Sequence, residues 1–179
     1  ALAPLGLEVT LLEAAEPRQP DPPSYDDRTL ALGGASCRIL EGLGLWAGVE
    51  PSATPIRRVS VTELGRPGHV GLDAAAMGLP AFGNVVEARA FGEAVLARID
   101  TLDGVRFEWP VRATGLTQDE DAVTVEADRD GTPEAWQARL VIGADGADSS
   151  VRSLLGIGAQ SHDYGQVAVI CNVTPEEFH

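Results

Sequence analysis

The residues best suited to contact a ligand lie at 140–152, where an apolar run leads into small residues, an acid and a glycine. Gly143 and Gly146 would let a ligand approach the backbone closely, and the Asp145 carboxylate could accept a hydrogen bond from a ribose or ribityl hydroxyl. Ser149 is a candidate N-cap for a following short helix. A strand–turn–helix connection with Asp-Gly as turn chemistry explains the same residues. The residue types alone favour the two interpretations equally.

A second acid, Glu13, ends an apolar run at 7–13 that is typical of a short buried strand. In a nucleotide-binding βαβ unit, an acid at the end of the second strand hydrogen-bonds the adenosine ribose. That acid lies about 20 residues after a GxGxxG fingerprint, but the residues before Glu13 contain no such fingerprint. An ordinary exposed acid at a strand end is the alternative, and the local sequence favours it.

One glycine pattern, GxGxxA at 42–47, matches a phosphate loop only in its spacing. A phosphate loop follows a strand and opens a helix, so that its N–H groups point at the pyrophosphate. Gly42 and Gly44 instead follow a segment with helical spacing. We therefore interpret these glycines as the end of that helix.

The charged residues exclude several kinds of chemistry. All 13 basic residues are arginine, so the sequence offers no Schiff-base lysine, P-loop lysine or Ser–Lys catalytic pair. The net charge of −14 and an isoelectric point near 4.4 argue against a nucleic-acid partner, which needs a basic face. No apolar run approaches the length of a membrane span and no signal peptide is visible, so the sequence predicts a cytoplasmic protein.

Cysteine and histidine are too scattered for a metal centre. Cys37 and Cys171 lie far apart without a CxxC, and His69, His162 and His179 form no HxxxH or HxH pattern. Metal sites and disulfide frameworks both need characteristic ligand spacings. The sequence therefore predicts no bound metal and two small buried thiols.

The predicted helices and strands must position these candidate residues. Helices and strands alternate in the first part of the chain, and strands dominate after that. Helices are predicted up to residue 5, at 28–43, between Val86 and about residue 99, and at 149–155, so that Arg28 begins the second helix. Strands are predicted at 7–13, 56–63, 69–73, 105–107, 111–117, 122–127, 136–142 and 164–173, with a hairpin turn at 65–68. The mixture predicts an α/β fold with a neighbouring antiparallel sheet.

The stretch GADGADSSVR at 143–152 resembles the DG motif of the class A flavoprotein monooxygenases of the para-hydroxybenzoate hydroxylase type. Four more stretches resemble one branch, the ubiquinone-biosynthesis hydroxylases similar to 2-polyprenyl-6-methoxyphenol hydroxylase: GLEVTLLEA, DDRTLALGGASCRILEGLGLW, VVEARAFGEAVLARI and DYGQVAVICNV. They follow the family's order over most of the chain. The family's GxGxxG and G-D motifs have no counterpart here, and Ala88 replaces a frequent Asn, so the chain resembles an internal fragment.

The resemblance implies an α/β fold with a partial FAD-binding, Rossmann-like domain of the para-hydroxybenzoate hydroxylase type and the start of an antiparallel substrate-domain sheet. Residues 1–158 would form the FAD-binding domain, with inserted strands near 56–82 belonging to the substrate-side sheet. Residues 159–179 would begin the substrate domain. Because the phosphate-cradling loop is missing, we expect these 179 residues alone to bind FAD weakly and to be inactive.

The resemblance also implies roles for individual residues. Glu13 would bind the adenosine ribose of FAD, Arg28 would lie near the flavin and its pyrophosphate, and Arg89 would help to fix the cofactor. Asp145 and Gly146 would contact the ribose side of the flavin and the path of NAD(P)H.

Two further contacts are implied. The backbone at 111–113 would pass the adenine, and Arg152 would pair with an acid such as Asp148 as a structural brace.

The implied reaction is hydroxylation of a small aromatic, polyprenyl-phenol substrate in ubiquinone biosynthesis, with NAD(P)H as reductant and FAD carrying the chemistry. No side chain needs to act as a nucleophile, so no catalytic residue is predicted. Two alternatives stay open: another FAD-dependent oxidoreductase of the same fold, or an inactive fragment or interaction module. A polyprenyl substrate would imply peripheral membrane contact or a biosynthetic complex.

Overall fold

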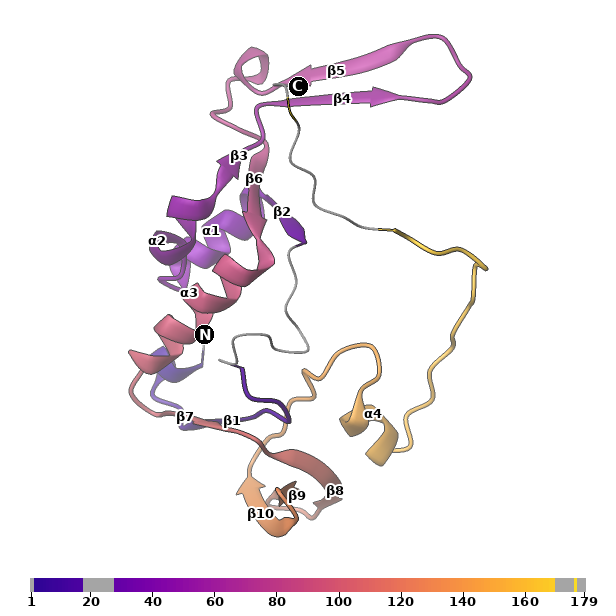
Figure 1. The fold of residues 1–179 in the computed structure, drawn as a ribbon. Coiled ribbons are helices and arrows are strands. Elements are labelled where there is room, and N and C mark those ends of the chain that lie inside the picture. The colour runs from indigo at the N-terminus through magenta and orange to yellow at the C-terminus, as the bar shows by residue number, and fades with distance from the viewer. Residues whose placement is uncertain (1, 18–27, 170–175, 177–179) are drawn as a thin grey trace.

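The computed structural model describes residues 2–17, 28–169 and 176. Within these residues, four small sheets follow one another along the molecule, from a two-stranded hairpin at one end to a three-stranded sheet at the other (Figure 1). The accessible surface of 13915 Å² exceeds the roughly 8,300 Å² expected of a compact protein of this mass. The sheets therefore share little common core. In the described part of the chain, no helix has both the length and the apolar character needed to cross a membrane.

The first sheet pairs two strands that are far apart in the sequence. β1 (Val9–Leu12) runs parallel to β7 (Val105–Glu108), with Val9 opposite Val105. A 3-10 turn, η1 (Ala3–Leu5), precedes β1 and is followed by Gly6 in the left-handed conformation, so it ends at residue 5 like the predicted helix. Because the strands are parallel, their carboxyl ends meet at one edge of the sheet, which is where open α/β sheets bind ligands.

The second sheet is antiparallel and carries most of the helices. β6 (Gly83–Glu87) lies between β2 (Thr29–Gly33) and β3 (Thr54–Pro55). The helices gathered beside it are α1 (Gly34–Gly42), α2 (Trp46–Val49), the 3-10 turn η2 (Glu50–Ser52) and α3 (Ala88–Asp100) (Figure 1). Val86 of β6 and Val49 of α2 are fully buried between sheet and helices. This layer forms the main apolar core.

The predicted helix at 28–43 is wrong in its first part. α1 begins only at Gly34, because residues 29–33 pair with β6 from Thr29 to Gly33. The alternation Thr-Leu-Ala-Leu fits a strand as well as a helix face, and the partner strand decides between them. Arg28 therefore precedes a strand rather than opening a helix. α1 ends at Gly42, which confirms that the glycines of the GxGxxA pattern terminate a helix.

The third sheet is a projecting hairpin. β4 (Arg58–Thr62) and β5 (His69–Asp73) pair antiparallel, as predicted, and a 3-10 turn η3 (Ala75–Met77) follows them. Val61 lies opposite Val70, and the two side chains are more than half exposed. One face of this hairpin is thus apolar and largely uncovered.

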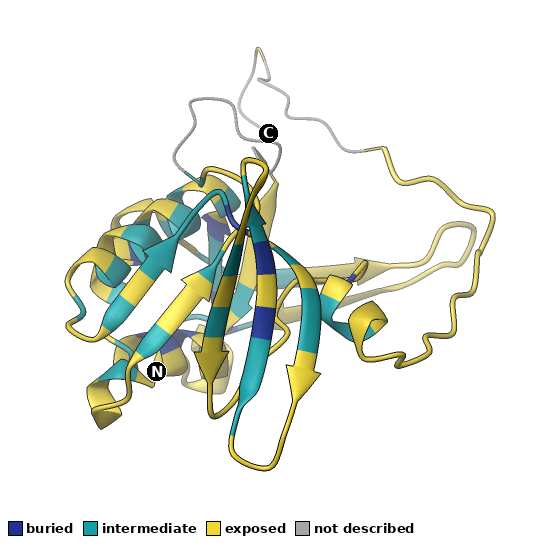
Figure 2. Cartoon of the chain, turned by 90° about the horizontal axis from the view of Figure 1, so that it is seen from below, coloured by how far each residue is buried: buried dark blue, intermediate teal, exposed yellow. Residues whose placement is uncertain are grey.

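The fourth sheet is an antiparallel meander of β8 (Arg112–Gln118), β9 (Val123–Arg129) and β10 (Thr132–Ala138). Buried residues lie on its middle strand, β9 (Figure 2). A short helix, α4 (Ser150–Leu154), lies beside it, close to the predicted 149–155.

Two predicted strands are wrong in whole or in part. The strand predicted at 136–142 begins earlier, as β10, and Leu140 and Ile142 beyond it are exposed and outside any strand. No strand forms over 164–169, and residues 170–173 of that prediction lie outside the described residues. Residues 140–142 are a continuous apolar run and apolar residues alternate in the second segment, but neither segment has a partner strand in the described part of the chain.

Candidate functional site

Glu13 lies at the carboxyl edge of the β1–β7 sheet, and its backbone is held on both sides. Its N–H donates to the Glu108 carbonyl at 3.0 Å, and its own carbonyl accepts from the Val111 N–H at 2.7 Å. The exposed carboxylate accepts one hydrogen bond through Oε1, from the Ala15 N–H at 3.0 Å. The structure thus presents an ordered, solvent-facing carboxylate where a ribose-binding acid is expected.

Arg28 and Arg89 both lie at one end of the β2–β6 strand pair in the second sheet. The Arg28 carbonyl accepts a hydrogen bond from the Ala88 N–H at 3.0 Å, and Thr29 lies opposite Glu87 in the β2–β6 ladder. Arg89 lies in the first turn of α3, with its guanidinium 3.8 Å from the Glu87 carboxylate. Two arginines that are distant in sequence therefore lie at the same end of one strand pair. Guanidinium groups are well suited to bind a pyrophosphate.

Asp145 faces the first turn of α4. Its carboxylate accepts hydrogen bonds from the Ser149 hydroxyl and, at 3.1 Å, from the Val151 N–H. Ser149 is buried and in turn accepts from the Arg152 N–H at 3.0 Å, which confirms it as the N-cap. The Ser149 hydroxyl and then the Val151 N–H hold the pKa of Asp145 below its usual value of 3.8. Helix capping therefore accounts for the geometry of Asp145, and a contact between Asp145 and a ligand stays a prediction.

The glycines of the same loop serve two purposes. Gly146 has a φ of 83°, in the left-handed region that favours glycine. A Cβ at Gly143 would lie 2.9 Å from Cγ1 of Val151, so a side chain there would push the loop away from α4. Gly143 thus lets the Asp145 loop pack closely against the helix, and Gly146 lets the loop turn.

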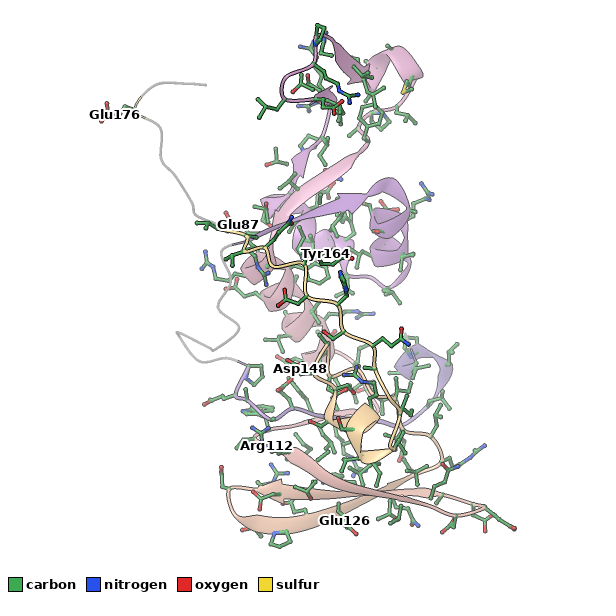
Figure 3. All side chains as sticks on the ribbon, turned by 90° about the vertical axis from the view of Figure 1, so that its right-hand side faces the viewer. Glu87, Arg112, Glu126, Asp148, Tyr164 and Glu176 are labelled. Atoms are coloured by element: carbon green, nitrogen blue, oxygen red, sulfur yellow. The ribbon has the colours of Figure 1, made fainter. Side chains whose placement is uncertain are left out.

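Arg152 braces this loop through a partner that we did not predict. Its guanidinium donates to the Ala147 carbonyl at 2.6 Å rather than pairing with Asp148. Figure 3 shows Asp148 between Glu87 and Arg112 along the long axis of the molecule. The DG-motif loop thus lies between the second sheet and the three-stranded sheet.

The pKa of Asp145 provides a test of the capping network. Replacing Ser149 by alanine removes the largest cause of the lowered pKa, so the Asp145 carboxyl should titrate closer to 3.8. An ionised carboxylate that is favoured in the folded state stabilises it above the unfolded pKa, and this stability is lost as the pH falls through the folded pKa. Loss of the N-cap should also cost about 1 kcal/mol near neutral pH. NMR titration of the carboxyl carbon measures the pKa, and an unchanged value in Ser149→Ala would contradict the assignment.

Sequence reasoning missed one polar cluster. Arg129 pairs with Glu108 and Glu134, at 2.8 and 2.7 Å, where β7 meets the three-stranded sheet. Asp130 and Gly131 both have positive φ, as in a type I′ hairpin turn. That Asp-Gly signal could have placed Arg129 and Glu134 on one face of a hairpin, but nothing in the sequence brings Glu108 to them.

Other parts of the described structure offer weaker candidates. A shallow groove between α2 and α3 is lined mainly by small residues, and none of the predicted site residues lines it. Among the described residues, no group of three or more His, Cys, Asp or Glu side chains could hold a metal ion. Cys37 is buried, as predicted, whereas Cys171 and His179 lie outside the described residues.

Comparisons with known proteins add to this geometry. A sequence model of the family described as FAD binding domain matches residues 1–178. The chain is 34% identical over 179 residues to the ubiquinone hydroxylase UbiL of Rhodospirillum rubrum, covering 100% of this chain and 41% of that protein. It is 35% identical over 177 residues to the 3-demethoxyubiquinol 3-hydroxylase of Escherichia coli, covering 98% of this chain and 44% of that one.

The fold is also found in solved structures. The anhydrotetracycline hydroxylase OxyS of Streptomyces rimosus superposes with a TM-score of 0.73 at 26% identity, over 90% of this chain and 31% of that chain. This likeness confirms the predicted α/β fold of the flavin monooxygenase type. The chain spans less than half the length of the curated relatives that it matches.

Proposed function

Since the chain belongs to the FAD-binding domain family of the flavoprotein monooxygenases, we propose that it forms the flavin-binding part of a hydroxylase of ubiquinone biosynthesis. The substrate would be a polyprenyl phenol, and NAD(P)H and oxygen would be consumed. The observation that carries the proposal is that Arg28 and Arg89 both lie at one end of the β2–β6 pair. Identities of 34% and 35% to two ubiquinone-pathway hydroxylases support the substrate class.

The described residues fit the polar groups of FAD. Glu13 offers an ordered carboxylate for the ribose hydroxyls, and Arg28 and Arg89 offer guanidinium groups for the pyrophosphate. Gly146 lets the chain approach the ribityl side closely, and Asp145 beside it keeps acceptor capacity beyond its two capping bonds. When bound, FAD supplies the redox chemistry. These residues bind and orient it, and none of them needs to be a nucleophile.

We propose that residues 1–158 form the FAD-binding domain and that 159–179 begin the substrate domain, with the strands near 56–82 on the substrate side. The apolar face of the β4–β5 hairpin supports this division. Val59 lies opposite Leu72, and Val61 opposite Val70, on one face. A two-stranded hairpin is marginal by itself, so a covered apolar face is expected.

Polar substitutions on the hairpin test whether this face is covered. In the complete gene product, Val61→Asp should cost roughly 2 kcal/mol if substrate-side elements pack on it. Ser60→Asp, on the opposite face of the same strand, should stay within about 0.5 kcal/mol and serves as the control. Denaturant unfolding measures both variants, and equal small effects would mean that the face stays open to water.

The same sequence predicts weak cofactor binding by the 179-residue polypeptide alone. These residues contain no GxGxxG between a strand and a helix, and such a loop stabilises the pyrophosphate. We expect its FAD dissociation constant to be at least about 100-fold higher than that of the complete gene product. Quenching of flavin fluorescence measures both constants, and near-stoichiometric flavin in the purified polypeptide would overturn this expectation.

The reaction itself has a direct test. The purified complete gene product should carry FAD and oxidise NAD(P)H faster when a short-chain polyprenyl phenol is added, with oxygen from ¹⁸O₂ appearing in the product. Substrate-stimulated NAD(P)H oxidation without ¹⁸O in the product would favour a different FAD-dependent oxidoreductase. A protein that binds no FAD would favour an inactive or interaction role.

We further propose a cytoplasmic protein with peripheral membrane contact, alone or within a biosynthetic complex. The support is the chemistry of a polyprenyl tail, which partitions into lipid. Flotation of the complete gene product with vesicles that contain the substrate tests this contact, and a protein that stays at the bottom of the gradient would contradict it.

A further inference from the structure

A half-buried arginine joins the first sheet to the three-stranded sheet. Arg129, on β9, donates through Nε to Oε1 of Glu134 at 2.7 Å and through Nη2 to Oε2 of Glu108 at 2.8 Å. Nη1 donates to the Trp109 carbonyl at 3.3 Å. The three charged side chains are each less than one-third exposed. Both edges of the guanidinium fork are thus in use, and only one partner, Glu134, lies on the same hairpin.

The other two partners of Arg129 belong to the segment that holds Glu13. Glu108 ends β7, and its carbonyl accepts the hydrogen bond of the Glu13 N–H at 3.0 Å. Val111, three residues further, is 2% exposed and donates its N–H to the Glu13 carbonyl at 2.7 Å. Arg129 donates hydrogen bonds to this short segment, at the Glu108 carboxylate and the Trp109 carbonyl. Arg129 therefore bonds to the same short segment, 108–111, whose backbone bonds to the N–H and the carbonyl of Glu13.

The hairpin that carries the cluster has its own backbone pairing and turn. β9 and β10 pair over seven residues each, from Thr132 opposite Arg129 to Ala138 opposite Val123. The type I′ turn at Asp130 and Gly131 fixes their register. What the cluster adds is a fixed place for residues 108–111 relative to this rigid sheet.

We propose that Arg129, oriented by Glu134, is a positioning residue for Glu13: it sets where the Glu13 carboxylate lies at the edge of the β1–β7 sheet. The inference rests on the proposed function, in which Glu13 binds the adenosine ribose of FAD. Arg129 does not touch the cofactor. Its loss lets the 108–111 segment shift, and the ribose contact then weakens while the remaining flavin contacts persist.

A double-mutant cycle in the complete gene product tests this coupling. Arg129→Gln and Glu13→Gln should each raise the FAD dissociation constant about 10-fold, and the double variant should be no weaker than Glu13→Gln alone. Arg129→Lys keeps the charge but loses the fork, so it should fall in between. Arg139→Gln, at an exposed arginine just beyond strand β10, is the matched control and should leave the constant unchanged.

The affinity for FMN separates positioning from a general loss of structure. FMN has no adenosine, so Arg129→Gln should leave its dissociation constant unchanged, whereas a loosened fold would weaken both flavins. If Arg129→Gln fails to fold, Glu134→Gln, which leaves the bond from Arg129 to Glu108, replaces it in the cycle.

The outcomes distinguish the two levels of the argument. The positioning role would be overturned if Arg129→Gln and Glu13→Gln raised the FAD dissociation constant independently, so that their factors multiply in the double variant. It would also be overturned if Arg129→Gln weakened the binding of FAD and FMN equally. Either result would leave the proposal that the protein binds FAD intact. A normal FAD affinity in Glu13→Gln would overturn the ribose contact and the positioning role with it. A wild-type protein without FAD affinity would overturn the proposed function itself.

Discussion

Replacing Gly83 by alanine should destabilise the fold by roughly 3 kcal/mol, because there is no room for a side chain at this position. A Cβ on Gly83 would lie 2.1 Å from the Leu32 carbonyl oxygen and 3.0 Å from Cα of Gly33. Both are backbone atoms of β2, so the strand pair itself would have to separate. The Gly83 carbonyl also accepts the Ile56 N–H at 2.9 Å, so the separation would reach the end of β3.

Gly92→Ala is the matched control for this prediction. Gly92 lies inside α3, and no heavy atom beyond its neighbours and its own helix lies within 4 Å of its added Cβ. Alanine in a helix interior is favoured over glycine, so this variant should gain about 0.5–1 kcal/mol. Denaturant unfolding of both variants in the complete gene product gives the comparison. A Gly83→Ala protein as stable as the wild type would show that β2 and β6 do not approach this closely.

The sequence predicts the fold best where a turn or cap residue acts locally. Gly6, Gly42 and Ser149 each end or begin an element where expected, because each residue's own conformation or hydrogen bonding determines the outcome. Residues 29–33 were harder to predict, since a short apolar run fits two periodicities and only the distant strand β6 selects one. Residues 140–142 show the converse, because these apolar residues have no partner strand among the residues that the structure describes and form no strand.

The candidate site shows the same division between local and distant causes. The position of Glu13 at a strand end follows from the sequence, but its N–H donates to the Glu108 carbonyl and its carbonyl accepts from the Val111 N–H, and these bonds join segments nearly a hundred residues apart. The direction of the Asp145 carboxylate depends on donors at Ser149 and Val151, which become its partners only once α4 forms. The sequence pattern thus predicts where Glu13 and Asp145 lie along the chain, whereas tertiary contacts determine which groups each carboxylate faces.

Arg28→Lys should weaken FAD binding strongly while leaving the fold intact. The Arg28 carbonyl accepts a hydrogen bond from the Ala88 N–H whatever the side chain, so the substitution changes only an exposed side chain at the strand end where Arg89 also lies. Lysine keeps the positive charge, and surface ion pairs contribute at most about 1 kcal/mol, so the melting temperature of the apo-protein should change little. Lysine cannot form the bidentate hydrogen bonds of a guanidinium. Because hydrogen bonds to a charged group contribute strongly to binding, this loss should raise the FAD dissociation constant about 10-fold or more.

The same substitution at Arg58 is the control for Arg28→Lys. Arg58 is exposed on β4, where it pairs with Asp73 at 3.1 Å, and it lies on the hairpin rather than beside Arg89. Arg58→Lys should leave flavin affinity unchanged, so a loss in both variants would reflect a general effect of replacing arginine. Isothermal titration of the complete apo-protein with FAD, together with thermal melting, measures both quantities. If Arg28→Lys melts many degrees lower and binds FAD normally, Arg28 supports the fold and does not hold the cofactor.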